Sequence, residues 1–376
     1  MKIGFDAKRA FHNFRGLGNY SRDLIASLSR YHTEQSYYLF TPDFNDDRAI
    51  HWLDQYNNLN VVRPKDFVSR KFPASWRSFK VAQEAKDLEL DIFHGLSHEL
   101  PQGIEKTGIK TVVTIHDLLF LRFPQNFKWL DRQVYFKKIK YATEVADVVI
   151  AICEQTKTDL INYLGCPAEK IRVVYQTCNP RFYSPIPVEK QVATVERYGI
   201  HDKFILYVGA IEPNKNTMTL VKAYADLKKS INHKLVIVGN GGKYKKQVES
   251  YIHSKGLEDR VIILSNVTND DLPAFYQRSD LFCFPSFFEG FGIPIIEALF
   301  SKTPVITSKG SVFPEAGGPN TIYVDPNNKQ ELSEQISNVL TNHDLAFEMV
   351  EMGRNFVEKF HRRQTAQNLV DLYNSL

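Results

Sequence analysis

The chain has few cysteines for its length, and their spacing suggests neither a disulfide framework nor a metal site. Four occur among 376 residues, namely Cys153, Cys166, Cys178 and Cys283. No two of them form a C-x-x-C pair or another spacing typical of metal ligands. We therefore expect reduced and mostly buried thiols.

Long apolar runs and a leader-like N-terminus are also lacking. No stretch reaches the roughly 18 apolar residues that a membrane-spanning helix requires. Met1 leads directly into K-I-G-F-D-A, which shows no signal pattern. With 24% charged and 43% apolar residues, the composition predicts a cytoplasmic enzyme. A formal net charge of +4 is too small to indicate a nucleic-acid partner.

The dinucleotide-binding fingerprint is absent, although we expect glycine-rich loops after two predicted strands, at residues 8–19 and 238–243. After Gly16-Leu17-Gly18, the sixth position of G-x-G-x-x-G is occupied by Ser21, and V-G-N-G-G-K at residues 238–243 also fails the spacing. An NAD-dependent oxidoreductase is therefore disfavoured.

Alternating strand and helix patterns run through most of the chain and predict two parallel sheets with helices on both faces. The first series of expected strands is 2–7, 37–41, 60–63, 91–94, 110–115, 147–152 and 172–175. The second is 204–208, 234–238, 261–264, 281–284 and 305–307. Three prolines between residues 180 and 187 suit an interdomain connection. The sequence thus predicts an α/β protein of two doubly wound domains with a ligand cleft between them.

The stretch from Leu281 to Phe300 has the most specific pattern. The strand is expected to end at Pro285. Gly290 and Gly292 permit unusual backbone angles, and we expect a helix to begin near Ile293. The unpaired amide groups at such a helix start favour an anion such as a diphosphate. Two carboxylates, Glu289 and Glu297, flank this start, where open α/β sheets bind ligands.

The segment E-G-F-G-I-P-I-I-E-A-L resembles the E-x7-E signature of retaining glycosyltransferases of family 4, which have the GT-B fold. The resemblance covers almost the whole chain, strongly over residues 204–326 and weakly over 42–90. It implies two Rossmann-like domains that face each other across a cleft. Residues 1–180 would bind the acceptor, residues 181–358 would bind the nucleotide-sugar donor, and residues 359–376 would form a helix that crosses back to the N-terminal domain.

The resemblance also implies roles for individual residues. Lys215, in Y-V-G-A-I-E-P-N-K-N, would contact the diphosphate, Glu297 the ribose, and Glu289 the sugar hydroxyls. Many family members have an arginine directly after the glycine of this segment or just before the lysine. This chain has Ala210 and Asn214 at those positions, so one cation is missing there or supplied elsewhere. The full expected donor site is Gly16, Gly18, Gly209, Lys215, Val267, Glu289, Gly290, Phe291, Gly292, Ile293 and Glu297.

His116 follows the strand 110–115 directly, in T-I-H-D-L, which resembles the family's active-site histidine segment. A histidine at a strand's carboxyl end lies where substrates bind, and we expect the adjacent Asp117 to fix its tautomer or raise its pKa. The expected catalytic residues are therefore His116, Glu289 and Lys215.

These features predict a retaining hexosyltransferase that needs no cofactor and no metal, because no D-x-D pair accompanies a diphosphate loop. The loops look most like those of mannosyltransferases of polysaccharide and O-antigen assembly, so GDP-mannose is the first expected donor, before UDP-glucose and UDP-N-acetylhexosamines. The acceptor would be a saccharide or a lipid-linked saccharide. Alternatives are a GT-B nucleotide-sugar epimerase and a non-catalytic two-domain sugar-binding protein.

Two stretches of the N-terminal half combine basic and aromatic residues, and the second falls on an expected helix at 129–142. Such a helix can lie on an anionic membrane surface, which predicts peripheral contact with the inner face of the membrane. The alternative is an ordinary helix whose Trp129, Arg132 and Phe136 face the core. The stretches are Arg63, Lys65, Arg70, Lys71, Phe72, Trp76, Arg77 and Lys80, then Phe127, Lys128, Trp129, Arg132, Tyr135, Phe136, Lys137, Lys138, Lys140 and Tyr141.

Overall fold

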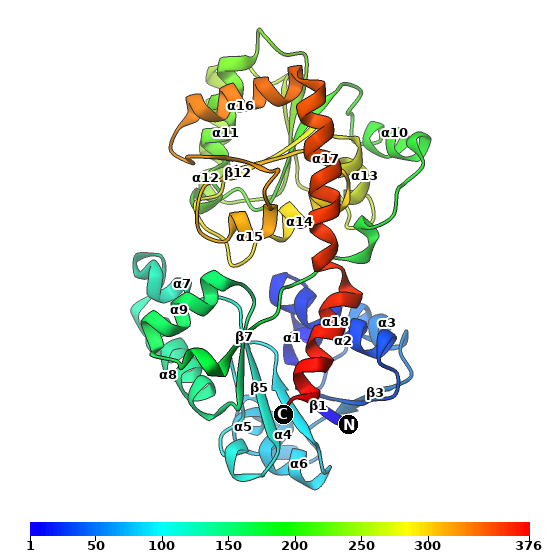
Figure 1. Cartoon of the computed structure of the whole chain (residues 1–376), viewed down its shortest axis with the longest axis vertical. Helices are drawn as coiled ribbons and strands as arrows, with labels where there is room; N and C mark the ends of the chain where they lie inside the picture. Colours follow the sequence, from blue (N-terminus) through cyan, green and yellow to red (C-terminus); the bar gives the residue numbers. More distant parts are fainter. The chain divides into compact units, whose positions relative to one another are not determined.

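A computed structural model of the chain describes residues 1–376 apart from the side chain of Asn126. It divides into two compact units (Figure 1). Unit 1 comprises Met1–Thr177 and His361–Leu376, and unit 2 comprises Cys178–Phe360. The sequence pattern placed these divisions at residues 180 and 358.

The sheet of unit 1 is entirely parallel, with the order β3-β2-β1-β4-β5-β6-β7 in the described part of the chain. Its strands are β1 (Lys2–Asp6), β2 (Ser36–Phe40), β3 (Leu59–Val62), β4 (Ile92–Gly95), β5 (Lys110–Ile115), β6 (Val148–Ala151) and β7 (Ile171–Val173). Each of the seven overlaps a predicted strand.

Helices cover both faces of this sheet, because successive strand residues point to opposite sides. In β6, for example, Ile150 packs into one core with α2 and α18, while Val149 packs into the other with α6, α8 and α9. The helices are α1 (Lys8–His12), α2 (Gly16–Tyr31), α3 (Asp47–Leu53), α4 (Phe67–Lys71), α5 (Pro73–Phe79), α6 (Val81–Asp87), α7 (Leu119–Arg122), α8 (Trp129–Val145), α9 (Glu154–Leu164) and α18 (Arg362–Asn374), with short 3-10 turns η1 (Ile104–Lys106), η2 (Pro124–Asn126) and η3 (Ala168–Lys170).

The last helix, α18, is an integral part of unit 1 although the chain reaches it only after unit 2. Ala366, Leu369, Val370 and Tyr373 recur at helical spacing, and all are buried against the first core. The Tyr373 hydroxyl also lies 2.6 Å from Nδ1 of His94, which is fully buried in β4. The helix that the resemblance assigned to the N-terminal domain therefore packs there.

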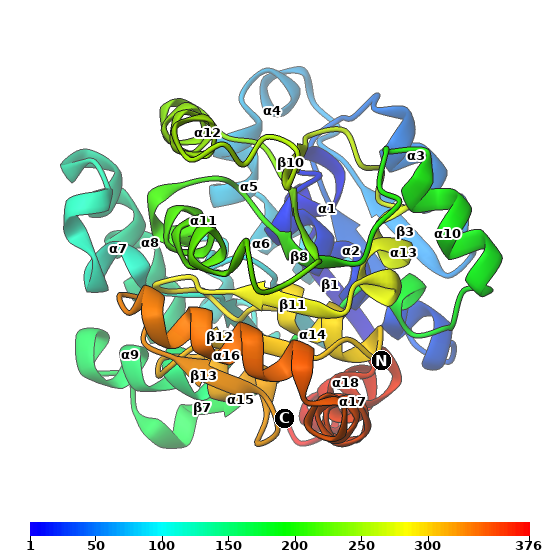
Figure 2. The same ribbon diagram turned by 90° about the horizontal axis from the view of Figure 1, so that it is seen from above.

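Unit 2 contains a second parallel sheet, ordered β10-β9-β8-β11-β12-β13 among the described residues. Its central strands run through the middle of the unit with helices around them (Figure 2). The strands are β8 (Phe204–Val208), β9 (Lys234–Val238), β10 (Val261–Leu264), β11 (Leu281–Phe284), β12 (Val305–Ser308) and β13 (Ile322–Val324). All four residues of β11 are at most 1% exposed, as expected for a strand covered on both faces.

The helices of unit 2 include α14, which begins at Ile293 as predicted. They are α10 (Val188–Glu196), α11 (Thr217–Leu227), α12 (Lys243–Ser254), α13 (Leu272–Arg278), α14 (Ile293–Phe300), α15 (Phe313–Gly317), α16 (Lys329–Thr341) and α17 (His343–Val357), with 3-10 turns η4 (Pro180–Phe182), η5 (Pro213–Lys215) and η6 (Glu358–Phe360). None of the helices formed by the described residues has the length and apolar character needed to cross a bilayer.

One expectation about the surface of unit 1 is wrong. Trp76 and Arg77 do not belong to an exposed basic and aromatic stretch, since Trp76 is 1% exposed and donates its indole N–H to Glu84 over 2.8 Å. Arg77 makes an ion pair of 2.5 Å with Asp6 at the end of β1. Both side chains therefore stabilise the interior of the unit.

Candidate active site

The strand order of unit 2 reverses between β8 and β11, since β9 and β10 lie on one side of β8 while β12 and β13 lie beyond β11. Doubly wound sheets bind ligands outside the carboxyl ends of the strands at such a reversal. The loops that follow these two strands, residues 209–216 and 285–292, contain most of the predicted donor-site residues.

The structure brings Lys215 and Glu289 together at this point. The Lys215 ammonium lies 2.7 Å from Oε1 and 2.6 Å from Oε2 of Glu289. The side chains are 21% and 12% exposed, respectively. A cation and a carboxylate that are predicted to contact adjacent parts of one donor therefore form an ion pair with each other.

Asn216 joins the two loops, and no sequence motif points to it. Its amide Nδ2 donates to the carbonyls of Pro285, over 3.0 Å, and Pro326, over 2.7 Å. Its backbone has a left-handed φ of 56°, which asparagine tolerates better than most residues. The Phe287 amide also donates to the Asn214 carbonyl over 2.9 Å. These bonds fix the positions of Lys215 and Glu289.

The N-terminus of α14 lies beside this pair in the sequence. Gly292 caps the helix with φ 104°, a conformation that side-chain-bearing residues rarely adopt, and Pro294 falls in the first turn. On the next turn, Glu297 accepts a hydrogen bond of 2.9 Å from the hydroxyl of buried Tyr276. Burial, and then the charge of Glu297, raise the pKa of Tyr276 well above its usual value, so Tyr276 is a neutral donor that orients the carboxylate.

The remaining predicted donor-site residues of unit 2 occupy the same edge of the sheet. Gly209 follows β8, and its amide donates to the Val238 carbonyl over 3.0 Å. Gly290 is half-buried in the loop after β11, while Phe291 is buried with its ring against that of Phe360. Val267 is half-buried after β10, which is two strands from β8.

A further cation lies at this edge and was missed from the sequence. Lys245, in the first turn of α12, donates to the Ser265 hydroxyl over 3.1 Å and lies 3.7 Å from Glu249. No group of three or more His, Cys, Asp or Glu side chains among the described residues has an arrangement that would hold a metal ion.

Gly16 and Gly18 are not loop residues, contrary to the sequence analysis. Both belong to the first turn of α2, and α1 occupies part of the expected loop. A Cβ on Gly18 would lie 1.6 Å from the Asn13 carbonyl oxygen and 2.8 Å from that of Arg9, whereas a Cβ on Gly16 would meet nothing within 4 Å. Gly18 is therefore required for close packing of α2 against α1.

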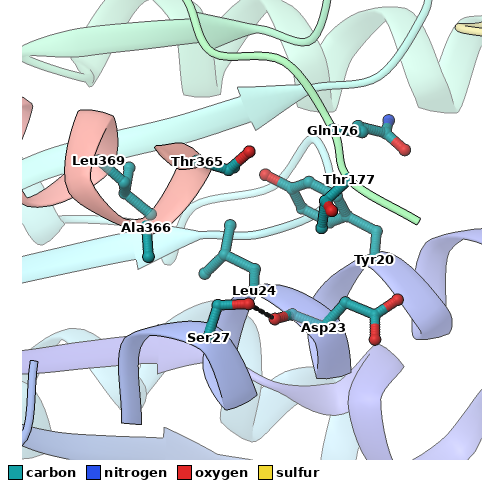
Figure 3. A pocket seen from close by; sticks show the side chains of 9 residues that line it. All are labelled: Tyr20, Asp23, Leu24, Ser27, Gln176, Thr177, Thr365, Ala366 and Leu369. Atoms are coloured by element: carbon teal, nitrogen blue, oxygen red, sulfur yellow. Dashed lines mark hydrogen bonds between the residues drawn. The ribbon is translucent and has the colours of Figure 1, made fainter. Parts of the chain in front are cut away.

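His116 follows β5 in unit 1 and is 4% exposed. Its Nε2 lies 2.9 Å from the Leu96 carbonyl and its Nδ1 lies 3.2 Å from Nε2 of Gln176. Because a carbonyl only accepts, Nε2 carries the proton and Nδ1 accepts from the Gln176 amide. Gln176 also lines a small pocket with Tyr20 of α2 and Thr365 of α18 (Figure 3).

The expected effect of Asp117 on His116 is confirmed only in part: its charge raises the pKa of His116, but burial outweighs this, and Asp117 does not fix the tautomer. The Asp117 carboxylate accepts from the amide of Leu119 over 3.1 Å, so the Leu96 carbonyl fixes the tautomer instead. Burial, then the neighbouring His98, lower the pKa of His116 to about 3. The imidazole is therefore neutral at physiological pH.

His98 is a second candidate in unit 1 and was not predicted from the sequence. It follows β4, next to the reversal between β1 and β4, and its ring centroid is 5.2 Å from that of His116. Its φ of 66° is unusual for a residue with a side chain, and its buried Nδ1 has no hydrogen-bond partner among the described residues. Strained residues of this kind gather at functional sites.

Three histidines make the stability of unit 1 sensitive to acid. Burial lowers the pKa to about 3 for His94 and His116 and to about 4 for His98, against about 6.5 in an unfolded chain. Between about pH 6.5 and pH 4 the unfolded chain therefore binds more protons, and stability falls as pH falls, by about 1.4 kcal/mol per pH unit for each histidine. Urea unfolding at pH 7 and pH 5 measures this loss. As a control, a His343→Gln variant, altered at an exposed position in unit 2, should lose as much stability between pH 7 and pH 5 as the unaltered chain. Equal stability of the unaltered chain at both pH values would contradict the prediction.

Comparison with known proteins agrees with this architecture. A family model described as "Glycosyltransferase Family 4" matches residues 14–181, and one described as "Glycosyl transferases group 1" matches residues 195–356. The chain is 24% identical over 351 residues to an O-antigen chain mannosyltransferase B of Escherichia coli, covering 89% of this chain and 90% of that protein. It is 28% identical over 228 residues to the O-antigen chain mannosyltransferase RfbU of Salmonella typhimurium, covering 60% of each.

Solved structures share the fold over the whole chain. A glycosyltransferase from Rickettsia africae superposes with a TM-score of 0.78 at 19% identity, covering 100% of this chain and 98% of that one. Anabaena HepE, in complex with UDP and glucose, superposes with a TM-score of 0.75 at 22% identity and covers 100% of both chains. Since the two family models together match most of residues 14–356, the chain belongs to the glycosyltransferases of family 4, with the GT-B fold.

Proposed function

We propose that this glycosyltransferase transfers mannose from GDP-mannose to a hydroxyl of a saccharide or lipid-linked saccharide, with retention of the anomeric configuration, in polysaccharide biosynthesis. The Lys215–Glu289 pair at the strand-order reversal of unit 2 carries the proposal, because it combines a cation for a diphosphate with a carboxylate for sugar hydroxyls. The choice of mannose is supported by the relatives named O-antigen mannosyltransferases.

The reaction breaks the bond between the anomeric carbon and the diphosphate, so negative charge grows on the leaving group. Lys215 and the first amides of α14, at Gly292 and Ile293, would stabilise that charge. On donor binding, the diphosphate would replace Glu289 as the partner of the Lys215 ammonium, and Glu289 would then accept hydrogen bonds from sugar hydroxyls. Glu297, oriented by Tyr276, would accept from the ribose hydroxyls. This scheme needs no metal and no cofactor.

A donor panel tests the proposal. The full chain is incubated with GDP-mannose, UDP-glucose and UDP-N-acetylglucosamine, with mannose-terminated acceptors and with EDTA present. We expect acceptor-dependent GDP release, unaffected by EDTA, and a product whose anomeric proton signal shows the donor's α-configuration. Release only from a UDP-sugar would reject the mannose assignment. Epimerised donor without any acceptor would favour an epimerase, and binding without turnover would favour a sugar-binding protein.

The role proposed for His116 is contact with the donor sugar. Its Nδ1 accepts from Gln176 in the structure, so a sugar hydroxyl would have to replace that amide. We expect His116→Ala to lower kcat at least tenfold, about 1.4 kcal/mol in activation free energy, while GDP affinity stays within about twofold. Steady-state kinetics and GDP titration measure the two effects. The matched variant Gln176→Ala removes the competing amide and should reduce kcat less, whereas equal losses of GDP binding and kcat in His116→Ala would contradict the assignment.

Peripheral membrane contact through α8 is also part of the proposal. Trp129, Leu130 and Val134 are 65%, 69% and 51% exposed, so the first half of this helix does not face a core in the described structure. Trp129 is therefore not a core residue, whereas Phe136, later in the same helix, is half-buried against the core as the alternative expects. Lysines flank these side chains, and each contributes on the order of 1 kcal/mol near an anionic surface.

Sedimentation with anionic vesicles tests this contact. We expect binding at low salt that weakens at high salt, and loss of binding when Trp129 and Leu130 are replaced by Ser or when Lys137, Lys138 and Lys140 are replaced by Glu. Phe347→Ser, at a 69% exposed aromatic of unit 2, is the matched control and should bind as the unaltered chain does. Failure to bind at low salt would rule the contact out.

A further inference from the structure

Unit 2 contains a pocket of about 550 Å³ at the C-terminal end of α14. Its lining includes Tyr183, Gln191, Phe300, Ser301, Lys302 and Arg354. The donor site proposed above lies at the other end of this eight-residue helix, roughly 12 Å away at 1.5 Å per residue. The pocket is therefore separate from the donor site.

Lys302 has an unusual backbone for its position. It follows the C-cap Ser301 and has a left-handed φ of 61°. Glycine is the usual residue directly after a helix C-cap, because the left-handed conformation is strained for residues with a Cβ. Lys302 is exposed and forms no ion pair among the described residues. Lys302 therefore places a cation at the edge of the pocket, although its left-handed backbone conformation would favour glycine.

The other charged side chains of the pocket leave a positive excess. Arg354 pairs with Glu358 and lies over the ring of Phe300, 5.2 Å from its centroid. Together with Lys302, the charged side chains that line the pocket are therefore two cations and one carboxylate. The Ser301 hydroxyl, in the pocket wall, is buried without a hydrogen-bond partner among the described residues. These groups suit a ligand that carries a negative charge and accepts hydrogen bonds.

The rest of the lining suits a sugar ring. Tyr183 packs against Phe300, with 4.4 Å between ring centroids, and the apolar C–H face of a sugar can pack on such rings. Asn355 is an exposed amide at the same pocket, and Gln191 adds another. Amides both donate to and accept from hydroxyl groups. The volume lies within the range of small-molecule sites.

We propose that this pocket binds a monosaccharide phosphate, with the phosphate at Lys302 and Arg354 and the sugar against Tyr183. Its ligand would contact residues 183–191, near the start of unit 2, and residues 354–358, near its end. Binding would therefore join the two terminal segments of the unit and stabilise it against unfolding.

Calorimetric titration of the full chain with mannose 6-phosphate tests the proposal, with mannose and inorganic phosphate as separate probes. We expect mannose 6-phosphate to bind at least tenfold more tightly than either probe and to raise the melting temperature. Lys302→Gly should weaken this binding at least fivefold, while the melting temperature without ligand stays the same or rises, because glycine suits the left-handed backbone. This combination separates loss of a ligand contact from loss of folding.

A donor-site variant serves as the control. Lys215→Ala should bind mannose 6-phosphate as the unaltered chain does, whereas it should lose affinity for GDP. Unchanged binding in Lys302→Gly, or binding lost in Lys215→Ala, would overturn the assignment to this pocket. Inorganic phosphate that binds as tightly as mannose 6-phosphate would overturn the sugar part of the proposal.

Discussion

Glu289→Gln is expected to tighten binding of GDP about threefold or more while it lowers the rate of sugar transfer at least tenfold, about 1.4 kcal/mol. In the structure both carboxylate oxygens of Glu289 engage the Lys215 ammonium, at 2.7 and 2.6 Å. A diphosphate must compete with that carboxylate for the ammonium and is also repelled by it. Glutamine removes the charge and keeps the shape, so the nucleotide gains affinity while the sugar loses the ionised acceptor.

Calorimetric GDP titration and steady-state kinetics measure the two opposite effects. Asp226→Asn is the matched control, since Asp226 forms an ion pair of 2.7 Å with Lys329 in the same unit, with both side chains about half exposed. It should change neither GDP affinity nor kcat. Weaker GDP binding in Glu289→Gln would show that the carboxylate supports the nucleotide rather than the sugar.

The strands and the start of α14 could be predicted because their signals are local. A short apolar run bounded by polar residues and proline identifies a buried parallel strand such as β11, and Gly292 with Pro294 marks the helix start. The four short helices between residues 47 and 87 were not predicted, since each spans seven residues or fewer and shows little periodicity. β13, a strand of three residues at the edge of its sheet, was also not predicted.

Side-chain partnerships in the candidate site required three-dimensional information. Lys215 and Glu289 were identified separately, but 73 residues separate them in the chain, and only the adjacency of β8 and β11 brings them together. Asn216 joins two loops through carbonyls at positions 285 and 326, which no local pattern shows. The group that fixes the tautomer of His116 was expected to be Asp117, and the actual one, the Leu96 carbonyl, lies twenty positions earlier in the sequence.

Gly18→Ala is expected to have the largest effect on stability. The added methyl carbon would lie 1.6 Å from the Asn13 carbonyl oxygen, and a backbone atom cannot move aside as a flexible side chain can. Either α2 shifts away from α1 or the Asn13 peptide rotates, and overpacking of this kind costs on the order of 3 kcal/mol or more. Urea unfolding should show that loss, or the variant should fail to accumulate as folded protein.

Gly16→Ala is the matched variant, two residues earlier in the same helix. A Cβ there meets nothing within 4 Å, so alanine should leave stability unchanged or raise it by up to about 1 kcal/mol through its better helix propensity.

Because the Gly16→Ala variant stays folded, it also tests whether Gly16 contacts the donor. A fall in GDP-mannose affinity in Gly16→Ala would support the donor contact that the family resemblance implies for Gly16. Unchanged affinity would argue against that contact and leave only the packing requirement at Gly18. Similar stability losses in the two variants would contradict the packing argument, since only one of the two positions lacks room for a methyl group.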